Sequence, residues 1–533
     1  MSATLIRLTL LLSLVIASAC QQGCNEGEDK SFLQLNITSE PPTLDPTQAT
    51  DLTSGLVLKM LFDGLTRIGQ DGKPEMAIAE SVDISADGRV FRFKLREAYW
   101  TNGDKIRALD FAYAWRMSLS PQYPSANSNL LYVIHNARAA KEGRVPVNEV
   151  GIRTIDDSTL EVELEAPIPY FLELTASHIY FPIHYRNAKH DTVWAAEAGP
   201  NYISNGPFRL VKWRHNNELV LVKNERYWDV ASVRLEGIHL SMIEDQTTEL
   251  NLFESGFLDW AGTPLSVGLP SDALVPLREE GRLQSQPMVA TYYYQFNIKV
   301  APLHNAKIRK ALSYAIDRNA IVTYVTQGGE HAALGLVPAS ISFKPEGFFK
   351  DHDTATAQRL FAEGLAEEGM TVENFPLLTL SYNTAESHHK IAQVVQQQWR
   401  EVLGVQVQIE NDEWKVYLDR LNKHQFDIGR LSWVADVRDP INLLEVFQYD
   451  SLSSNHTQWH SDKYSNLLEQ AQQTRELDRR RNLLIEAEAL LMDEMPIAPI
   501  YFLSTSYLKS ARLHGVFLSG LGDIDFRWAW LDD

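Results

Sequence analysis

The sequence contains almost no cysteine. Cys20 and Cys24 are the two cysteines among its 533 residues, so no disulfide framework can hold the folded body together. After these positions the chain also lacks a run of roughly 18 apolar residues, the length that a membrane-spanning helix needs. Its stability must come from buried apolar side chains, which a composition with 44% hydrophobic residues can supply.

Positively charged residues are also scarce relative to negatively charged ones. The 49 Lys and Arg residues are outnumbered by 69 Asp and Glu residues, and the formal net charge is −20. A surface with this balance repels the phosphates of nucleic acids and anionic membranes, so we predict no nucleic-acid partner. The basic run 479–481 predicts a solvated, ion-paired helix face, because acidic residues surround it. These are Glu476, Asp478, Glu486 and Glu488.

Catalytic and nucleotide-binding motifs are missing as well. The sequence has no H-E-x-x-H, no G-x-S-x-G, no P-loop and no G-x-G-x-x-G. Residues 83–88 imitate the start of a calcium loop, but Lys94 stands where a bidentate glutamate is required, so we predict a β-turn. His456 and His460 lie in a Ser- and Asn-rich stretch, which predicts a loop and not a metal site. We therefore predict no catalytic residue, no metal and no cofactor.

The N-terminus carries a targeting pattern. A positive charge, a short apolar run and an A-x-A cleavage pattern together predict a signal peptide over residues 1–19. Cys20 follows at once and resembles the cysteine that receives lipid in bacterial lipoproteins. Ala17 stands where those proteins usually have leucine, so a lipid anchor at Cys20 and a soluble periplasmic product are both open. Residues 20–30 are polar and predict a flexible tether.

The rest of the chain predicts a lobed protein of mixed α and β structure. Its 533 residues exceed the roughly 250–300 at which one hydrophobic core stops growing, so two or more lobes are expected. Helical spacing and apolar–polar alternation occur without the regular βαβ rhythm of a doubly wound fold. Strands are predicted over 32–37, 89–96, 158–167, 208–213 and 218–224, and helices over 56–65 (ended by Gly64), 108–119, 305–325 and 467–491.

One further predicted strand, 426–436, carries two opposite charges. Alternation places Phe426, Ile428 and Arg430 on one face, so a guanidinium shares an apolar side and needs an anion. Asp436 lies six positions on, at most roughly 20 Å away along an extended chain. The two side chains can form a structural ion pair, or they can receive the two charged termini of a free peptide. The residues alone leave both readings open.

Short motifs along the chain resemble one known family. The motifs are PTLDP (42–46), LFDGL (61–65), AES (79–81), WTNGD (100–104), DDSTLEV (156–162), NGPF (205–208), NERYW (224–228), TYYY (291–294) and KIRKALSYAIDR (307–318). Singly each motif is weak, but their order over nearly the whole mature chain is similar to that of the bacterial extracellular solute-binding proteins, family 5, the peptide receptors of ABC importers.

This resemblance implies a mixed α/β, periplasmic-binding-protein-like fold of class II (cluster C). Two large lobes would close on a hinge, with an extra small domain beside them. Lobe I would comprise 31–62, 187–290 and 505–533, the extra domain II 63–186, and lobe III 291–504. The implied function is that of a monomeric, non-enzymatic receptor, periplasmic or lipid-anchored outside the membrane. It would capture oligopeptides and deliver them to the membrane permease subunits of an ABC importer.

The resemblance also implies site residues. Asp436 would receive the α-ammonium of the peptide, and Arg430 the carboxylate of short peptides. Backbone groups around Trp433 and Val434 would pair with the peptide as an added strand. The remaining positions that match residues bordering the ligand are Trp414, His388, Asn383, Tyr293 and Leu52.

Three departures from the family pattern bear on the ligand. Thr50, Gln295 and Leu421 stand where the best-known members carry a glutamate, a second acid and an arginine. They leave peptide length and side-chain preference open. The same fold with a dipeptide, a murein peptide or a metal chelate is an alternative, and an exported peptide hydrolase is an alternative of another class.

Overall fold

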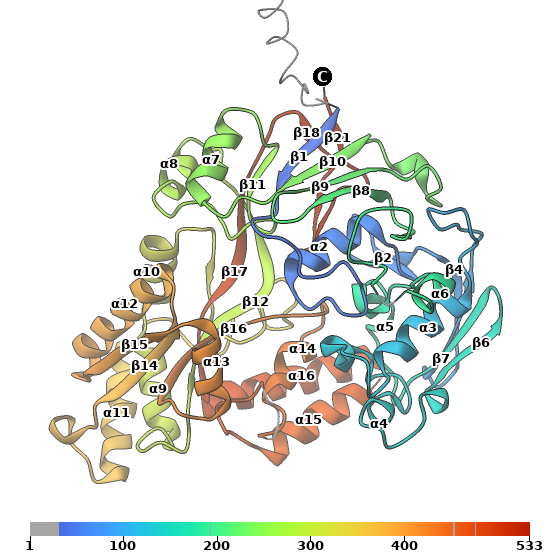
Figure 1. Ribbon diagram of the computed structural model, residues 1–533. Coiled ribbons are helices and arrows are strands. Elements are labelled where there is room, and N and C mark those ends of the chain that lie inside the picture. The colour runs from blue at the N-terminus through green and yellow to red at the C-terminus, as the bar shows by residue number, and fades with distance from the viewer. Residues whose placement is uncertain (1–30, 192, 451–453, 475, 533) are drawn as a thin grey trace, which may run out of the picture.

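Three sheets of four or more strands organise the structure, a computed structural model that describes residues 31–191, 193–450, 454–474 and 476–532. Each sheet lies in a different region of the molecule, and helices pack around it (Figure 1). The prediction of a mixed α/β fold is confirmed. The predicted signal peptide, tether and lipidation candidate Cys20 lie outside the described residues. No helix within the described ranges is long and apolar enough to cross a membrane.

The first sheet joins distant parts of the chain. Its order is β1 (Phe32–Asn36), β10 (Gly237–Ser241), β9 (Glu218–Lys223) and β8 (Phe208–Arg214), and β1 pairs parallel with β10. Helix α2 (Leu52–Leu61) contacts β8 and begins after Asp51, whose carboxylate accepts a hydrogen bond from the Ser54 N–H over 2.8 Å. Helices α7 (Gln246–Glu254) and α8 (Leu274–Glu279) enclose a small core of their own.

The second sheet is antiparallel throughout. Its order is β4 (Ala79–Ile84), β5 (Val90–Leu95), β7 (Thr159–Glu163) and β6 (Ile152–Asp156). The turn predicted at 83–88 is confirmed by a hydrogen bond from the Gly88 N–H to the Ser85 carbonyl, 2.8 Å long. Helix α3 (Ala108–Ser118) packs on β6 and β7, and its apolar side chains share one continuous core with the first sheet.

Short elements complete this half of the molecule. They are β2 (Thr66–Ile68), β3 (Pro74–Met76), η1 (Ala126–Leu131), α4 (Ala137–Lys141), η2 (Val147–Glu149), α5 (Phe171–Leu174), η3 (His178–Tyr180), α6 (Tyr185–Ala188), η4 (Val230–Ser232), β18 (Leu513–His514), β19 (Phe517–Leu518), β20 (Ile524–Asp525) and β21 (Trp530–Leu531).

Two long strands carry the third sheet from this half into the other (Figure 1). β12 (Gln284–Phe296) and β17 (Ile497–Lys509) pair antiparallel, and each is 13 residues long. One end of β17 pairs with β11 (Trp260–Gly262), while the sheet continues from β12 through β16 (Ile428–Val434), β14 (Leu378–Asn383) and β15 (Val407–Asp412). The β12–β17 register shifts between Pro287 and Thr291. This shift separates the part of the two strands near β11 from the part that pairs with β16.

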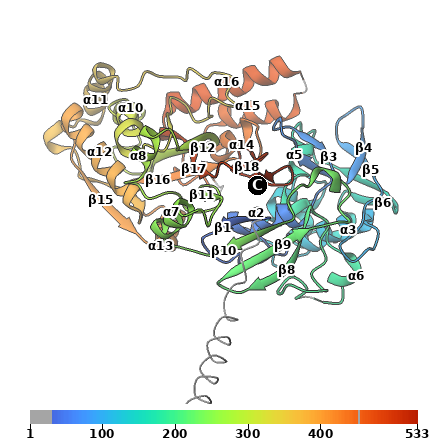
Figure 2. The same ribbon diagram turned by 90° about the horizontal axis from the view of Figure 1, so that it is seen from above.

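Helices cover both faces of the third sheet. One core contains side chains of α9 (Ala306–Tyr314), α11 (Thr354–Glu368) and α12 (Glu386–Leu403), and the other those of α13 (Trp414–Asn422), α14 (Ile441–Leu444), α15 (Asp462–Gln473) and α16 (Leu477–Glu494). Tyr292 and Tyr294 belong to the first core and Tyr293 to the second, as strand alternation requires. Seen from above, α11 and α12 lie on the side opposite the second sheet (Figure 2).

The prediction of one helix over 305–325 is wrong. After α9 ends, the chain resumes as α10 (Arg318–Ile321) and the π-helical turn η5 (Val322–Thr326). The buried guanidinium of Arg318 donates hydrogen bonds to the carbonyls of Ser313 and Ile316. A continuous helix would use these carbonyls for its own N–H groups, so the buried arginine interrupts it.

Two further helix predictions differ from the structure. The single helix predicted over 467–491 is wrong, because α15 and α16 are separate helices that pack against each other. The helix predicted over 56–65 begins at Leu52 and ends at Leu61, before Gly64. It ends there because the buried Asp63 N–H donates to Asn205 Oδ1 over 3.1 Å instead of continuing the helix.

The sequence predicted a solvated helix face for the basic run 479–481. For Arg480 this prediction is wrong. Arg480 is buried and forms two hydrogen bonds of 2.8 Å with the two carboxylate oxygens of Asp439. Glu488, two turns on, is also buried, and its Oε1 accepts from the backbone N–H groups of Leu336 and Val337. One face of α16 therefore points into the core and not into solvent.

Candidate functional site

A cavity of about 630 Å³ lies where the regions of the three sheets meet. Its walls come from segments that are far apart in the sequence. They include Leu52 and Lys59 of α2, Asn127 and Asn129 of η1, Glu173 of α5, His178, Thr263, Met288, Asp523 and the segment from Trp433 to Asp436 at the end of β16.

One edge of β16 is free beside this cavity. β14 pairs with β16 at Ile428 and Gly429, and from Arg430 to Val434 the pairing is with β12 alone. The Arg430 carbonyl accepts from the Tyr417 hydroxyl, away from β12, whereas the Ala435 N–H donates to β12. Because backbone groups alternate along a strand, those of Ser432 and Val434 face the free edge. An extended ligand can add to the sheet there.

Asp436 lies just after this edge. Its backbone N–H donates to Asn442 Oδ1 over 2.7 Å, which fixes the chain at this point. The side chain is exposed to the cavity, but the surrounding protein removes enough water to raise the pKa of the carboxyl. Within the described part of the chain no cation pairs with it. The ion pair between Arg430 and Asp436, one of the two readings of the sequence, is not formed.

Arg430 forms a half-buried cationic site on the face of the third sheet that carries Tyr292 and Tyr294. Its Nη1 donates to Asn383 Oδ1 over 3.1 Å, and its Nη2 donates to Ser432 Oγ over 3.3 Å. Burial, and then the nearby Arg430 charge, lower the pKa of His388 to about 3, so this imidazole is neutral. Among the described residues no carboxylate pairs with Arg430, and neither Arg430 Nε nor His388 Nδ1 has a hydrogen-bond partner. This site lacks an anion.

Comparison with known proteins decides the family. A sequence model described as bacterial extracellular solute-binding proteins, family 5, matches residues 73–455. The chain belongs to this family. It is 41% identical to the oligopeptide-binding protein OppA of Bacillus subtilis (strain 168) over 99% of each chain. It is 35% identical to the dipeptide-binding protein DppE of the same organism, over 98% of this chain and 97% of DppE.

The family fold implied by the motifs is confirmed by a solved structure. The Escherichia coli murein tripeptide binding protein MppA matches with a TM-score of 0.78 at 30% identity, covering 95% of this chain and 99% of MppA. The family consists of binding proteins for solutes outside the cytoplasm, as its description states.

The other expected ligand-bordering residues have different surroundings. Leu52 is 57% exposed and lines the cavity. Trp414 is 44% exposed at the start of α13, with its ring 6.4 Å from that of Tyr417. Tyr293 is fully buried and packs on Phe447 with ring centroids 5.9 Å apart, on the face of the sheet away from Arg430.

Sequence reasoning missed three residues of the site. The first is Tyr292, whose ring lies beneath Arg430. The TYYY motif alone does not show which tyrosine packs against Arg430, because this depends on the register between β12 and β16. Glu173 was missed because its partner, Arg438, is 265 positions away, and Asn442 because the loop conformation that brings it to the Asp436 N–H has no sequence signal. The backbone groups that can pair with a ligand are those of Ser432 and Val434, and not those of Trp433 and Val434 as expected. Trp433 faces β12, whereas Ser432 faces the free edge.

A hydrogen-bonded chain supports the loop that contains Asp436. Asn442 accepts from the Asp436 N–H and donates through Nδ2 to Glu445 Oε1 over 2.9 Å. Burial raises the pKa of Glu445 to about 7. Beside it, the buried Arg480–Asp439 ion pair ties the same loop to α16. The loop is therefore held from two directions.

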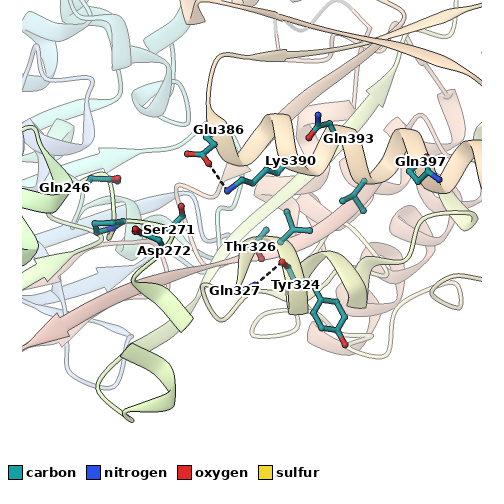
Figure 3. A pocket seen from close by; sticks show the side chains of 13 residues that line it. Gln246, Ser271, Asp272, Tyr324, Thr326, Gln327, Glu386, Lys390, Gln393 and Gln397 are labelled. Atoms are coloured by element: carbon teal, nitrogen blue, oxygen red, sulfur yellow. Dashed lines mark hydrogen bonds and ion pairs between the residues drawn. The ribbon is translucent and has the colours of Figure 1, made fainter. Parts of the chain in front are cut away.

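A second cavity, of about 850 Å³, lies along α12, the helix that contains His388. One wall is α12, where Glu386 and Lys390 form an ion pair of 2.8 Å on either side of His388 in sequence. The facing wall contains Gln246 of α7 and Asp272 (Figure 3). The cavity is lined mainly by polar side chains, so a chain that extends past Arg430 would enter a hydrated space.

Proposed function

We propose that this chain is the extracytoplasmic receptor of an ABC importer, which captures oligopeptides and delivers them to the membrane permease. One observation supports this above all others. Arg430 and Asp436, without ionic partners in the described part of the chain, flank a free strand edge. A free peptide in extended conformation has the complementary features: an ammonium, a carboxylate and backbone groups that pair with a strand.

The spacing of the two charges limits peptide length. Arg430 and Asp436 are six positions apart, or roughly 20 Å along an extended chain. With room for an ion pair at each end, this accommodates about four or five extended residues. Peptides of this length would use both charges. Longer peptides would keep the contact with Asp436 and extend past Arg430 toward the second cavity.

Affinity without strong side-chain preference follows from the same geometry. Pairing with the backbone of Ser432 and Val434 does not depend on the ligand's side chains. Relatives named for oligopeptides, dipeptides and a murein tripeptide support a peptide ligand in general. The oligopeptide assignment follows the relative with 41% identity.

Binding would proceed by closure of the lobes around the ligand. We propose lobe I as 31–62, 187–290 and 505–533, domain II as 63–186 and lobe III as 291–504, with the hinge in β12 and β17. Ligand contacts with both sides of the cavity would favour the closed form. No bond of the peptide is broken in this cycle, which distinguishes the receptor from an exported hydrolase. Export would follow from residues 1–19, and the product would be either periplasmic or anchored outside the membrane by lipid at Cys20.

Native mass spectrometry of the purified protein tests this function. We expect bound peptides of mixed sequence and narrow length distribution to be released on denaturation, with both termini free and no cleavage on incubation. Recovery of a bile acid, a metal chelate or only cleaved fragments would contradict the proposal. Titration with tri- to hexapeptides then measures the length preference directly.

A further inference from the structure

A second carboxylate faces the cavity that contains Asp436. Glu173 belongs to α5, in the half of the molecule that faces β16 across the cavity, and its side chain lines this cavity. Its Oε1 accepts a hydrogen bond from the Arg438 backbone N–H over 2.7 Å. Arg438 is two positions from Asp436, which limits the separation of their Cα atoms to about 7 Å. The two carboxylates therefore lie at the same end of the cavity.

The Arg438 charge acts on Glu173, but it does not form an ion pair with this carboxylate. Within the described ranges, no cationic side chain forms an ion pair with Glu173 or Asp436. Lys59 also lines the cavity, but it is paired with Asp523 over 2.5 Å. His178 donates from Nε2 to a backbone carbonyl, and burial lowers the pKa of its ring, so it contributes no positive charge near neutral pH.

One carboxylate oxygen of Glu173 accepts a hydrogen bond that fixes the side chain, and the other oxygen can still accept one. The hydrogen bond from Arg438 uses Oε1, and among the described residues no group donates to Oε2. Burial raises the pKa of the carboxyl, while the Arg438 side chain acts in the opposite direction. A cation entering the cavity would pair with the carboxylate and remove much of the cost of its burial.

We infer that Glu173 selects peptides whose first residue is basic, lysine or arginine. The inference rests on the proposed function, in which Asp436 holds the α-ammonium. The first side chain leaves the same residue as that ammonium, so its terminal cation can approach Glu173 while the ammonium remains at Asp436. A neutral first residue makes the same backbone contacts but leaves the Glu173 carboxylate without an ion-pair partner.

Calorimetric titration with two tetrapeptides tests this inference. One is Lys-Ala-Ala-Ala, and the other is norleucine-Ala-Ala-Ala, whose first side chain lacks the ammonium. We expect the natural protein to bind the lysine peptide about tenfold more tightly near neutral pH. In Glu173→Gln we expect this preference to disappear, so that the ratio of the two affinities falls to about one. Glutamine retains an acceptor for the Arg438 N–H, so only the charge is removed.

Glu80→Gln is the matched control, because Glu80 is an exposed carboxylate of β4 outside the cavity. It should retain the tenfold preference. Equal affinity of the natural protein for both peptides, or an unchanged preference in Glu173→Gln, would overturn the inference and leave the proposed function intact. If Glu173→Gln weakens both peptides equally, the residue is structural and the inference fails. Failure of both peptides to bind the natural protein would contradict the proposed function itself.

Discussion

The guanidinium carbon of Arg430 lies 4.5 Å from the centre of the Tyr292 ring, and no described carboxylate pairs with this arginine. The ring face and two neutral acceptors, Asn383 and Ser432, hold the cation without neutralising it. The site is thus preorganised for an anion that the protein does not supply. At the other end of the strand edge, Asp436 is held by Asn442 and lacks a cation in the same way.

Replacing Asp436 by asparagine removes a charge and preserves side-chain size. We expect the affinity for a tetrapeptide with a free amino terminus to fall at least about thirtyfold, because losing one partner of a desolvated pair costs about 2 to 5 kcal/mol. Calorimetry measures the change. The N-acetylated tetrapeptide is the control and should bind both proteins equally weakly. A similar loss for both peptides would show that the residue does not recognise the ammonium.

Arg430→Met should abolish the discrimination between a free and an amidated C-terminus of the ligand. The natural protein is expected to prefer a tetrapeptide acid over its C-terminal amide by about tenfold, the value of a charge-assisted hydrogen bond. In the variant the two ligands should bind alike. Competition binding with a labelled tetrapeptide provides the ratio. Retention of the acid preference in Arg430→Met would exclude this arginine as the carboxylate receptor.

Val434→Pro tests the strand edge. Proline lacks the N–H that faces the cavity, while an edge position tolerates it structurally. We expect about a tenfold loss of affinity for tetrapeptides, whatever their side chains. Val434→Ala keeps the N–H and serves as the control, with affinity close to that of the natural protein. Equal losses in the two variants would indicate that the valine side chain matters and the backbone does not.

The buried Glu488 makes stability depend on pH. Burial raises the pKa of its carboxyl in the folded state to about 7, from an ordinary value of 4.5. The folded state therefore binds this proton more tightly than the unfolded chain. The resulting stability is complete below pH 4.5 and is lost as the pH rises through about 7, by an amount on the order of 3 kcal/mol.

Glu488→Gln isolates this effect, because the amide oxygen can still accept from the N–H groups of Leu336 and Val337. Urea unfolding should show a gain of about 2 to 3 kcal/mol at about pH 8 and little change near pH 5. A gain of the same size at both pH values would mean that the ionisation of Glu488 is not its cause.

Arg480→Met should destabilise the loop that contains Asp436. The substitution leaves Asp439 as a buried charge without its partner, which costs about 3 to 5 kcal/mol. The double variant Arg480→Met, Asp439→Leu removes both charges and should recover most of the stability. Thermal unfolding of the three proteins measures both effects. If the double variant is as unstable as the single one, the unpaired charge is not the cause.

Local patterns predicted several elements well. Alternation in 89–96 and 158–167 identified β5 and β7, and the turn residues at 83–88 identified the turn between β4 and β5. These signals are short-range, because one buried face and one turn suffice to produce them. Helix continuity was less predictable. Arg318 donates to the carbonyl of Pro499 and Arg480 pairs with Asp439, and no local window contains either partner.

The sequence by itself determined the family, through motifs spread along the whole chain, and the presence of two opposite charges six positions apart in one predicted strand. Only the tertiary structure decided that Arg430 and Asp436 do not pair, that β14 leaves the strand edge free after Gly429, and that Glu173 enters the same cavity. The physical reason is the distance along the sequence over which each interaction acts. Alternation and turn chemistry act over a few residues, whereas pairing and burial depend on segments that are tens to hundreds of positions apart.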